Sequence, residues 1–505
     1  MWKVQNEVEI IMYFYEDNFN DSITSRSFIE ADRYFDKKLI NYFSLYLSFV
    51  LILFIFTILC DWDELRHFVN WFAPASLLLI CFFLSFLLLK KESKIICTPI
   101  PWFLAASGVY FGLGPLLYKF GNTETIRYVD IIWMISDEDL LQTNMLNIVG
   151  MLTIIVFFIG TYSLLKLKFV YQLIAFSNNI PITNIALSFL LIGEIVKYGI
   201  ALPYEFGMLS YKLPGSIFML KDLTLLGLML LGYLSVQKGK RWLLFLILLF
   251  SFEIFVDFIR FSKTALILTF IMPFLGRFLA SRQIKTLIIG GVLTVIIYLF
   301  ATNIVTWGRI EIAKDKGSHF RADLSERVEV IKQSSLDIIE KKDSERQSWW
   351  TRICYVPVQR FAMYLYDSGS PSNSFEMIFW TLIPRFIYPE KPVITSGGLE
   401  FNRIVFGSRS SSLGIGVFAD AYYNGGYLML LIACGFIGFI FSILSRLAFI
   451  ALQKKAFAFL PCIFLGIKMG FRIDGRFVSD YFGAMVMLVA YFLVIYILFL
   501  RRYRL

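Results

Sequence analysis

The segment Trp349–Gly426 decides how the rest of this chain is interpreted. It begins WWTRICYVPVQRFAMYLYD (349–367), continues as SFEMIFWTLIPRFIYPEKPVITSGGLEFNRIVFGSRSSS (374–412) and ends LGIGVFADAYYNGG (413–426). Its apolar runs are interrupted by Pro and Gly at a density that an ordinary spanning helix does not tolerate. Its arginines lie among aromatic residues, which indicates a place at a membrane edge where an anion is held.

The composition predicts a polytopic membrane protein. Of 505 residues, 58% are hydrophobic and 17% are charged, whereas soluble proteins are about 45–50% apolar and about 25% charged. The net charge of +10 is spread over many short connections, so we expect no nucleic-acid partner. The six cysteines are scattered, which argues against a disulfide framework or a metal site. Residues 1–38 are mixed polar and charged, so no cleavable signal peptide is expected.

Twelve stretches are apolar and long enough, or nearly so, to cross a bilayer. They cover residues 39–60, 69–89, 100–118, 145–165, 182–202, 216–236, 241–259, 262–281, 284–306, 422–445, 456–471 and 477–500. One alternating set of connections is much richer in Lys and Arg than the other. Because basic residues accumulate in cytoplasmic loops, both termini are expected in the cytoplasm and residues 307–421 outside.

The expected organisation is all-α. A cytoplasmic segment (1–38) precedes nine spans (39–306), a large extracytoplasmic loop (307–421), three spans (422–500) and a cytoplasmic tail (501–505). Within the loop, apolar residues at helical spacing over 324–338 predict an amphipathic helix. Phe375–Ile387 is apolar but too short to span, and it contains Pro384, so we expect a re-entrant or interfacial helix there.

Charged residues inside the expected spans predict a polar cavity. Glu253, Asp257 and Arg260 share one face near the outer end of the seventh span. They form either a structural ion pair at the helix end or the lining of a water-accessible cavity. Two further spans carry such residues: Glu194, Lys197, Lys221 and Asp222.

Basic residues in the expected outer loops are candidate anion ligands. A guanidinium binds phosphate through two parallel hydrogen bonds and stays charged at physiological pH. A cluster at the outer leaflet would suit a lipid pyrophosphate or an acidic sugar. The candidates are Arg260, Arg352, Arg360, Arg385, Lys391, Arg403, Arg472 and Arg476.

Two carboxylates are candidate catalytic bases, Asp420 and Glu400, because a carboxylate beside a cationic pocket can accept a proton from a hydroxyl. Asp420 lies where the chain enters the tenth span. Tyr422 and Asn424 follow it and either form an aromatic helix entry or line the polar cavity. Fixed arginines can stabilise a pyrophosphate leaving group without a metal. No P-loop, dinucleotide fingerprint or GxSxG motif is present, so no cofactor and no metal are expected.

Three motifs resemble the oligosaccharide repeat-unit polymerases, the O-antigen polymerase (Wzy-type) family: PRFIYPEKP (384–392), GGLEFNRIVFG (397–407) and DAYYNGG (420–426). IRFSKTALIL (259–268) is similar to the family's arginine-containing entry to a span. The resemblance implies a GT-C-type membrane glycosyltransferase in the bacterial cytoplasmic (inner) membrane. Its donor and acceptor would be undecaprenyl-pyrophosphate-linked oligosaccharides, joined on the outer face into the O-antigen of lipopolysaccharide or a related surface polysaccharide.

The same resemblance implies roles for individual residues. It points to pyrophosphate binding by Arg260, Arg385 and Arg403, to a catalytic role for Asp420, and to a chain-length regulator as a partner protein. The related O-antigen ligases rely on a histidine in the large outer loop, where this chain offers His319. A transporter or flippase of lipid-linked oligosaccharides would fit the twelve spans but would not need a long outer loop, so the polymerase is favoured.

Overall fold

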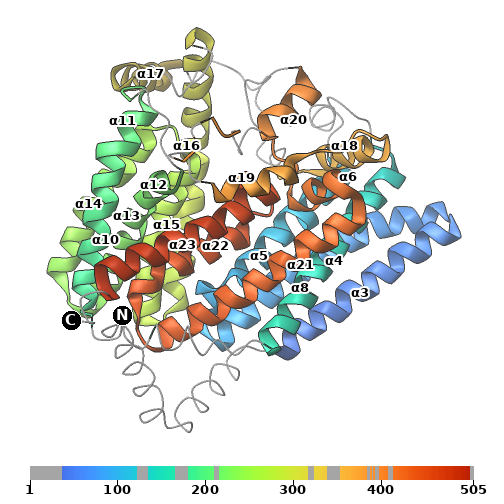
Figure 1. The fold of residues 1–505 in the computed structure, drawn as a ribbon, viewed down its shortest axis with the longest axis horizontal. Helices are drawn as coiled ribbons and strands as arrows, with labels where there is room; N and C mark the ends of the chain where they lie inside the picture. Colours follow the sequence, from blue (N-terminus) through green and yellow to red (C-terminus); the bar gives the residue numbers. More distant parts are fainter. Residues whose placement is uncertain are drawn as a thin grey trace, which may run out of the picture.

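The protein is a bundle of long apolar helices, shown as a computed structural model in Figure 1. The structure describes residues 37–121, 135–164, 174, 180–209, 215–316, 323–337, 353–383, 387–388, 390–392, 397–407 and 413–500. Every regular element in these residues is helical. Eleven of the described helices are long and apolar enough to cross a membrane. The chain is therefore an all-α polytopic membrane protein.

The helices follow one another with short connections. In chain order they are α3 (Lys37–Cys60), α4 (Asp63–Lys91), α5 (Pro99–Ser107), α6 (Gly114–Phe120), α8 (Asp137–Leu164), α10 (Ile182–Val196), α11 (Leu202–Glu205), α12 (Gly215–Met219), α13 (Leu223–Gln237), α14 (Lys240–Ile259), α15 (Lys263–Ser281), α16 (Ile284–Lys316), α17 (Leu324–Asp337), α18 (Val356–Asp367), α19 (Ile378–Leu382), α20 (Gly397–Phe406), α21 (Val417–Gln453), α22 (Leu460–Phe471) and α23 (Gly483–Ile495). Three π-helical turns continue α5, α10 and the start of α23: η2 (Gly108–Leu113), η3 (Lys197–Ala201) and η10 (Phe477–Phe482).

The expected spans match these helices, with one difference in length. Eleven of the twelve stretches correspond to helices of spanning length, whereas the stretch at 456–471 forms a shorter apolar helix, Phe457–Phe471. Nearly all residues of α22 are buried. A short helix is tolerated at membrane depth when surrounding protein encloses it and satisfies its ends.

The bundle consists of two groups of helices joined through the C-terminal ones (Figure 1). In one group α8 packs against α3, α4 and α21, and in the other α13 packs against α10, α14 and α15. Helix α22 contacts both α5 and α13. Small residues allow helix backbones to approach closely. Gly276 packs on the backbone carbonyl of Met229, and Gly438 on that of Ile154.

The connections predicted to share one membrane face do gather at one end of the bundle, which we call the loop-bearing end. It also carries α17, α18 and α20 (Figure 1). The contacts that join these connections are His67–Asp137, Arg360–Asp139, Arg260–Glu205, Arg327–Arg260 and Val417–Ile473. The alternation read from loop charge is thus present in the structure. That this end faces the outside of the cell stays a prediction.

Two expectations for the large loop agree with the described residues. Helix α17 occupies the stretch predicted to be amphipathic. The apolar stretch at 375–387 contains the five-residue helix α19, which is far too short to span. The Lys391 ammonium donates to the backbone carbonyls of Trp380 and Ile383, at 3.0 and 2.6 Å. It thereby satisfies carbonyls that the end of α19 leaves free.

Helix α21 begins earlier than the span predicted at 422–445 and bends near its start. Gly425 and Gly426 have non-helical backbone angles, so the first turns of α21 are set off from the rest. Gly426 has φ of 61°, and the ring of Tyr366 lies 2.9 Å from where a β-carbon would be. Only glycine combines this backbone conformation with that close approach.

Candidate functional site

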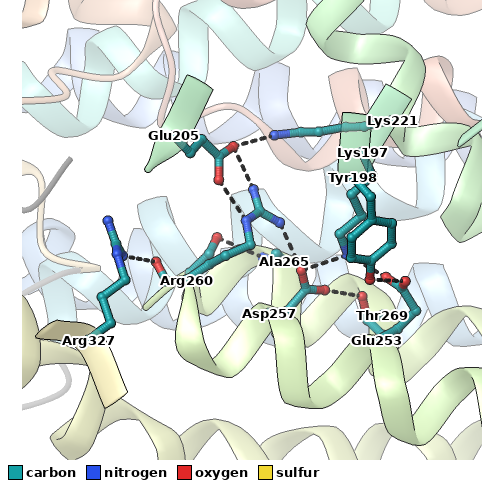
Figure 2. A network of polar contacts seen from close by, with 11 residues as sticks. Lys197, Tyr198, Glu205, Lys221, Glu253, Asp257, Arg260, Ala265, Thr269 and Arg327 are labelled. Atoms are coloured by element: carbon teal, nitrogen blue, oxygen red, sulfur yellow. Dashed lines mark hydrogen bonds and ion pairs between the residues drawn. The ribbon is translucent and has the colours of Figure 1, made fainter. Parts of the chain in front are cut away.

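A network of six charged side chains lies between α10, α13 and α14 at the loop-bearing end (Figure 2). We call it the charge cluster. Its members are Lys197, Glu205, Lys221, Glu253, Asp257 and Arg260. Charged groups inside a membrane protein are costly unless they are paired, and functional sites are where such groups are kept.

Arg260 is held at the centre of the cluster by the turn between α14 and α15. Helix α14 ends at Ile259, Phe261 adopts a left-handed conformation with φ of 53°, and Ser262 caps α15 by accepting from the backbone N–H of Ala265. The side chain of Phe261 is buried. A bulky residue with positive φ is strained, so its burial in the small apolar core beside α17 is what keeps this turn in place.

The guanidinium of Arg260 is fully engaged by carboxylates. Its Nε and Nη2 donate to the two oxygens of Glu205, both at 2.7 Å, and its Nη1 donates to Asp257 at 2.8 Å. Lys221 donates to Glu205 at 2.9 Å. Burial lowers the pKa of Arg260, but the two carboxylates raise it by more, so the guanidinium stays charged.

The deeper part of the cluster is enclosed by helices. Lys197 Nζ donates to Glu253 and, at 2.9 Å, to Asp257. The hydroxyl groups of Tyr198 and Thr269 donate to Glu253 and Asp257, each at 2.6 Å. Lys197 starts the π-helical turn η3. These groups satisfy one another where water does not reach, as buried ionic groups require.

A cavity of about 210 Å³ opens beside the cluster. We call it the charged cavity. Its charged lining consists of five basic residues and two acidic ones: Lys197, Lys221, Arg260, Lys468, Arg472, Asp222 and Asp257. Lys468 donates to Asp222 at 2.6 Å. The cavity therefore brings together Arg260 and Arg472, two arginines that the sequence predicted in separate connections.

A second ion pair joins the start of α21 to the turn after α22. Asp420 is completely buried, and its Oδ1 accepts from Arg476 Nε at 2.8 Å and Nη2 at 2.6 Å. Its Oδ2 accepts from the backbone N–H of Phe477 at 2.9 Å. Arg476 also donates through its backbone N–H to Asp480, which pairs with Arg472 at 3.3 Å. A chain of contacts thus connects Asp420 to the charged cavity.

The turn after α22 holds a further carboxylate, Asp474. Burial raises its pKa and the nearby Asp480 raises it further, whereas Arg472 lowers it, with a net rise above the ordinary aspartate value. Asp474 lies outside the spanning helices, between Phe471 and Phe477. It is a titratable group next to two arginines of the site.

The motif GGLEFNRIVFG forms α20, which covers the second ion pair. Gly397, its first residue, lies against the guanidinium of Arg476 with no room for a β-carbon. Glu400 and Arg403 pair with each other on the outer side of α20. Their side chains are 38% and 53% exposed, and neither is among the described residues that line the charged cavity.

The other predicted residues lie elsewhere. Arg360 Nε donates to Asp139 at 2.6 Å, and the Tyr422 hydroxyl donates to Asp367 at 2.8 Å. Asn424 accepts from the Phe375 backbone N–H at 3.1 Å and donates to the Asp420 carbonyl at 2.7 Å, so it connects the large loop to α21. Lys391 ends α19, as described above. Arg352 and Arg385 fall outside the described residues.

Three site residues were missed as ligand or partner candidates: Glu205, Asp480 and Lys468. Glu205 and Lys468 lie near span ends on the same side as Arg260, which was a usable signal. Spacing within one helix predicts Arg260–Asp257. It cannot predict Arg260–Glu205, because the two residues are 55 positions apart.

The chain matches no family model, no curated protein and no solved structure. Its site is therefore interpreted from its own geometry.

Proposed function

We propose that this protein is a bacterial inner-membrane glycosyltransferase that polymerises undecaprenyl-pyrophosphate-linked oligosaccharide repeat units. In this proposal the loop-bearing end is the outer face, both termini are cytoplasmic, and the product is O-antigen or a related surface polysaccharide. The observation that carries the proposal is the charged cavity. Five cationic side chains, from four separate parts of the chain, meet at one end of a bundle of spanning helices.

The size and place of the cavity fit a diphosphate at a membrane edge. Pockets that enclose drug-sized ligands measure about 300–1,000 Å³, whereas this cavity measures about 210 Å³. It would hold a charged head group while the isoprenoid stays in lipid and the sugars stay in water. As the glycosidic bond to the diphosphate breaks, negative charge develops on the leaving oxygen, and Arg260 and its neighbours would stabilise it.

The two candidate bases differ in accessibility. Both oxygens of Asp420 are occupied and its side chain is buried, which supports a role in positioning Arg476. Glu400 is partly exposed on α20, so an incoming hydroxyl can reach it. We therefore assign proton acceptance from the acceptor sugar to Glu400.

A transporter of lipid-linked oligosaccharides is the second candidate. The observation that favours it is the depth of the charge cluster. Glu253 lies almost two helical turns inside α14 and is completely buried with Lys197. Ionisable groups at such a depth are common on transport pathways.

One experiment separates the two functions. Cells whose only copy carries Arg260→Gln or Arg472→Gln are compared with cells carrying Arg66→Gln, a control at the same end that pairs with Asp61 and Asp63. A polymerase with the proposed site predicts loss of long polysaccharide and accumulation of single lipid-linked units on the outer leaflet for the two cavity variants. Accumulation on the inner leaflet indicates the transporter. Wild-type chain lengths in both cavity variants would refute a function for the cavity in polymerisation.

A further inference from the structure

The carboxylate of Glu205 occupies a place built for an anion. Three donors converge on it: Nε and Nη2 of Arg260, both at 2.7 Å, and Nζ of Lys221 at 2.9 Å (Figure 2). The two parallel bonds from one guanidinium are the arrangement that arginine uses for both carboxylate and phosphate. Arg260 and Lys221 both line the charged cavity.

Glu205 is also the carboxylate of the cluster with the least helical support. It is the last residue of α11, which has four residues and follows the π-helical turn η3. By contrast, Glu253 and Asp257 lie within the 20-residue helix α14. Moving Glu205 disturbs one short turn, whereas moving either of the others disturbs a spanning helix.

We propose that Glu205 occupies the phosphate subsite of the charged cavity and that a diphosphate replaces it on binding. This inference rests on the proposed function and names the place where the head group binds. When the carboxylate leaves, Arg260 keeps its bond to Asp257 and offers its other two N–H groups to a phosphate oxygen pair. Lys221 donates to the same phosphate.

The exchange accounts for the charge balance of the site. With Glu205 in place, the cations are neutralised and can remain in a largely apolar bundle without a ligand. A diphosphate carries more negative charge than one carboxylate, so it competes effectively for the same donors. The competition weakens the apparent affinity, because only the fraction of molecules with Glu205 displaced can bind.

The test measures binding of inorganic pyrophosphate to the purified full-length protein in detergent. Glu205→Gln removes the competing charge, so its affinity should be about tenfold higher than that of the wild type, or about 1.4 kcal/mol. Arg260→Gln should lose binding. Glu138→Gln is the matched control, because Glu138 is an exposed glutamate in the first turn of α8 at the same end, and its affinity should equal that of the wild type.

The outcomes distinguish this inference from the function on which it rests. Equal affinity in the wild type and Glu205→Gln, with binding lost in Arg260→Gln, overturns the role of Glu205 and leaves the diphosphate site standing. No binding by either the wild type or Glu205→Gln overturns both.

A measurement on the wild type covers the case in which Glu205→Gln does not fold. A cryo-EM structure with pyrophosphate should show phosphate oxygens bonded to Arg260 Nε and Nη2 and the Glu205 carboxylate displaced from them. Pyrophosphate bound elsewhere in the cavity, with Glu205 still on Arg260, refutes the inference.

Discussion

Replacing Asp420 with asparagine distinguishes a structural role for this carboxylate from a catalytic one. The side chain is completely buried and accepts two hydrogen bonds from Arg476 and one from the Phe477 backbone. Asparagine has nearly the same shape but no charge, and its NH₂ group must face one of these donors. The substitution therefore leaves a guanidinium without its counter-ion and brings two donors together.

The expected cost follows from the burial of the pair. Removing one partner of a buried ion pair destabilises a protein by about 3–5 kcal/mol. The Arg476 side chain is 13% exposed, so some of its charge remains solvated and the lower end of that range applies, about 3 kcal/mol. Arg476→Gln should cost a similar amount, since it leaves Asp420 buried without its cation.

The assay is unfolding in detergent, followed by tryptophan fluorescence, on Asp420→Asn, Arg476→Gln and the double variant. The double variant should lose clearly less stability than the sum of the single losses, because the two residues interact directly. Asp63→Asn is the control, since Asp63 is 91% exposed, and its stability should match that of the wild type. If Asp420→Asn unfolds like the wild type yet produces no polysaccharide, the structural role is wrong and a catalytic role for Asp420 stands.

Two further predictions concern the turn after α22 and the helix packing. Because burial raises the pKa of Asp474, its ionised form destabilises the folded state, so Asp474→Asn should unfold at a higher temperature than the wild type at pH 7. That advantage should shrink as the pH falls below the folded pKa and Asp474 becomes protonated; a constant or growing advantage in thermal scans at decreasing pH would contradict it. Gly276→Ala should destabilise the protein by about 1–3 kcal/mol, because its β-carbon would overlap the Met229 carbonyl, whereas Gly160→Ala, with nothing within 4 Å, should not. Equal unfolding of these two variants in detergent would show that the contact between α13 and α15 is looser than described.

The spans were predictable because each depends on a local quantity, the length of an apolar run. The start of α21 was not, because it depends on a distant contact. The backbone N–H of Val417 donates to Ile473 at 3.0 Å, and the bend at Gly425–Gly426 is filled by Tyr366. Neither partner lies close to α21 in the sequence.

The charge cluster was predictable in part for the same reason. Helical spacing places Asp257 and Arg260 one turn apart, and their ion pair is present at 2.8 Å. The choice between a structural pair and a cavity lining has no single answer, since Asp257 and Arg260 pair with each other and also line the charged cavity. Their remaining partners come from other helices, so only the packing of η3 and α13 against α14 identifies them.

Basic residues in an outer connection therefore indicate an anion site only after their counter-ions are known. Arg403 and Arg472 look alike in the sequence, yet Arg403 pairs with Glu400 on the surface of α20, whereas Arg472 lines a cavity together with Arg260. Surface pairs of this kind contribute little, because water screens them. Inside the bundle the same charges require partners, and each partner is a group that an incoming anion must displace. The affinity of such a site is then set by how easily its weakest-held carboxylate leaves, which in this fold is Glu205.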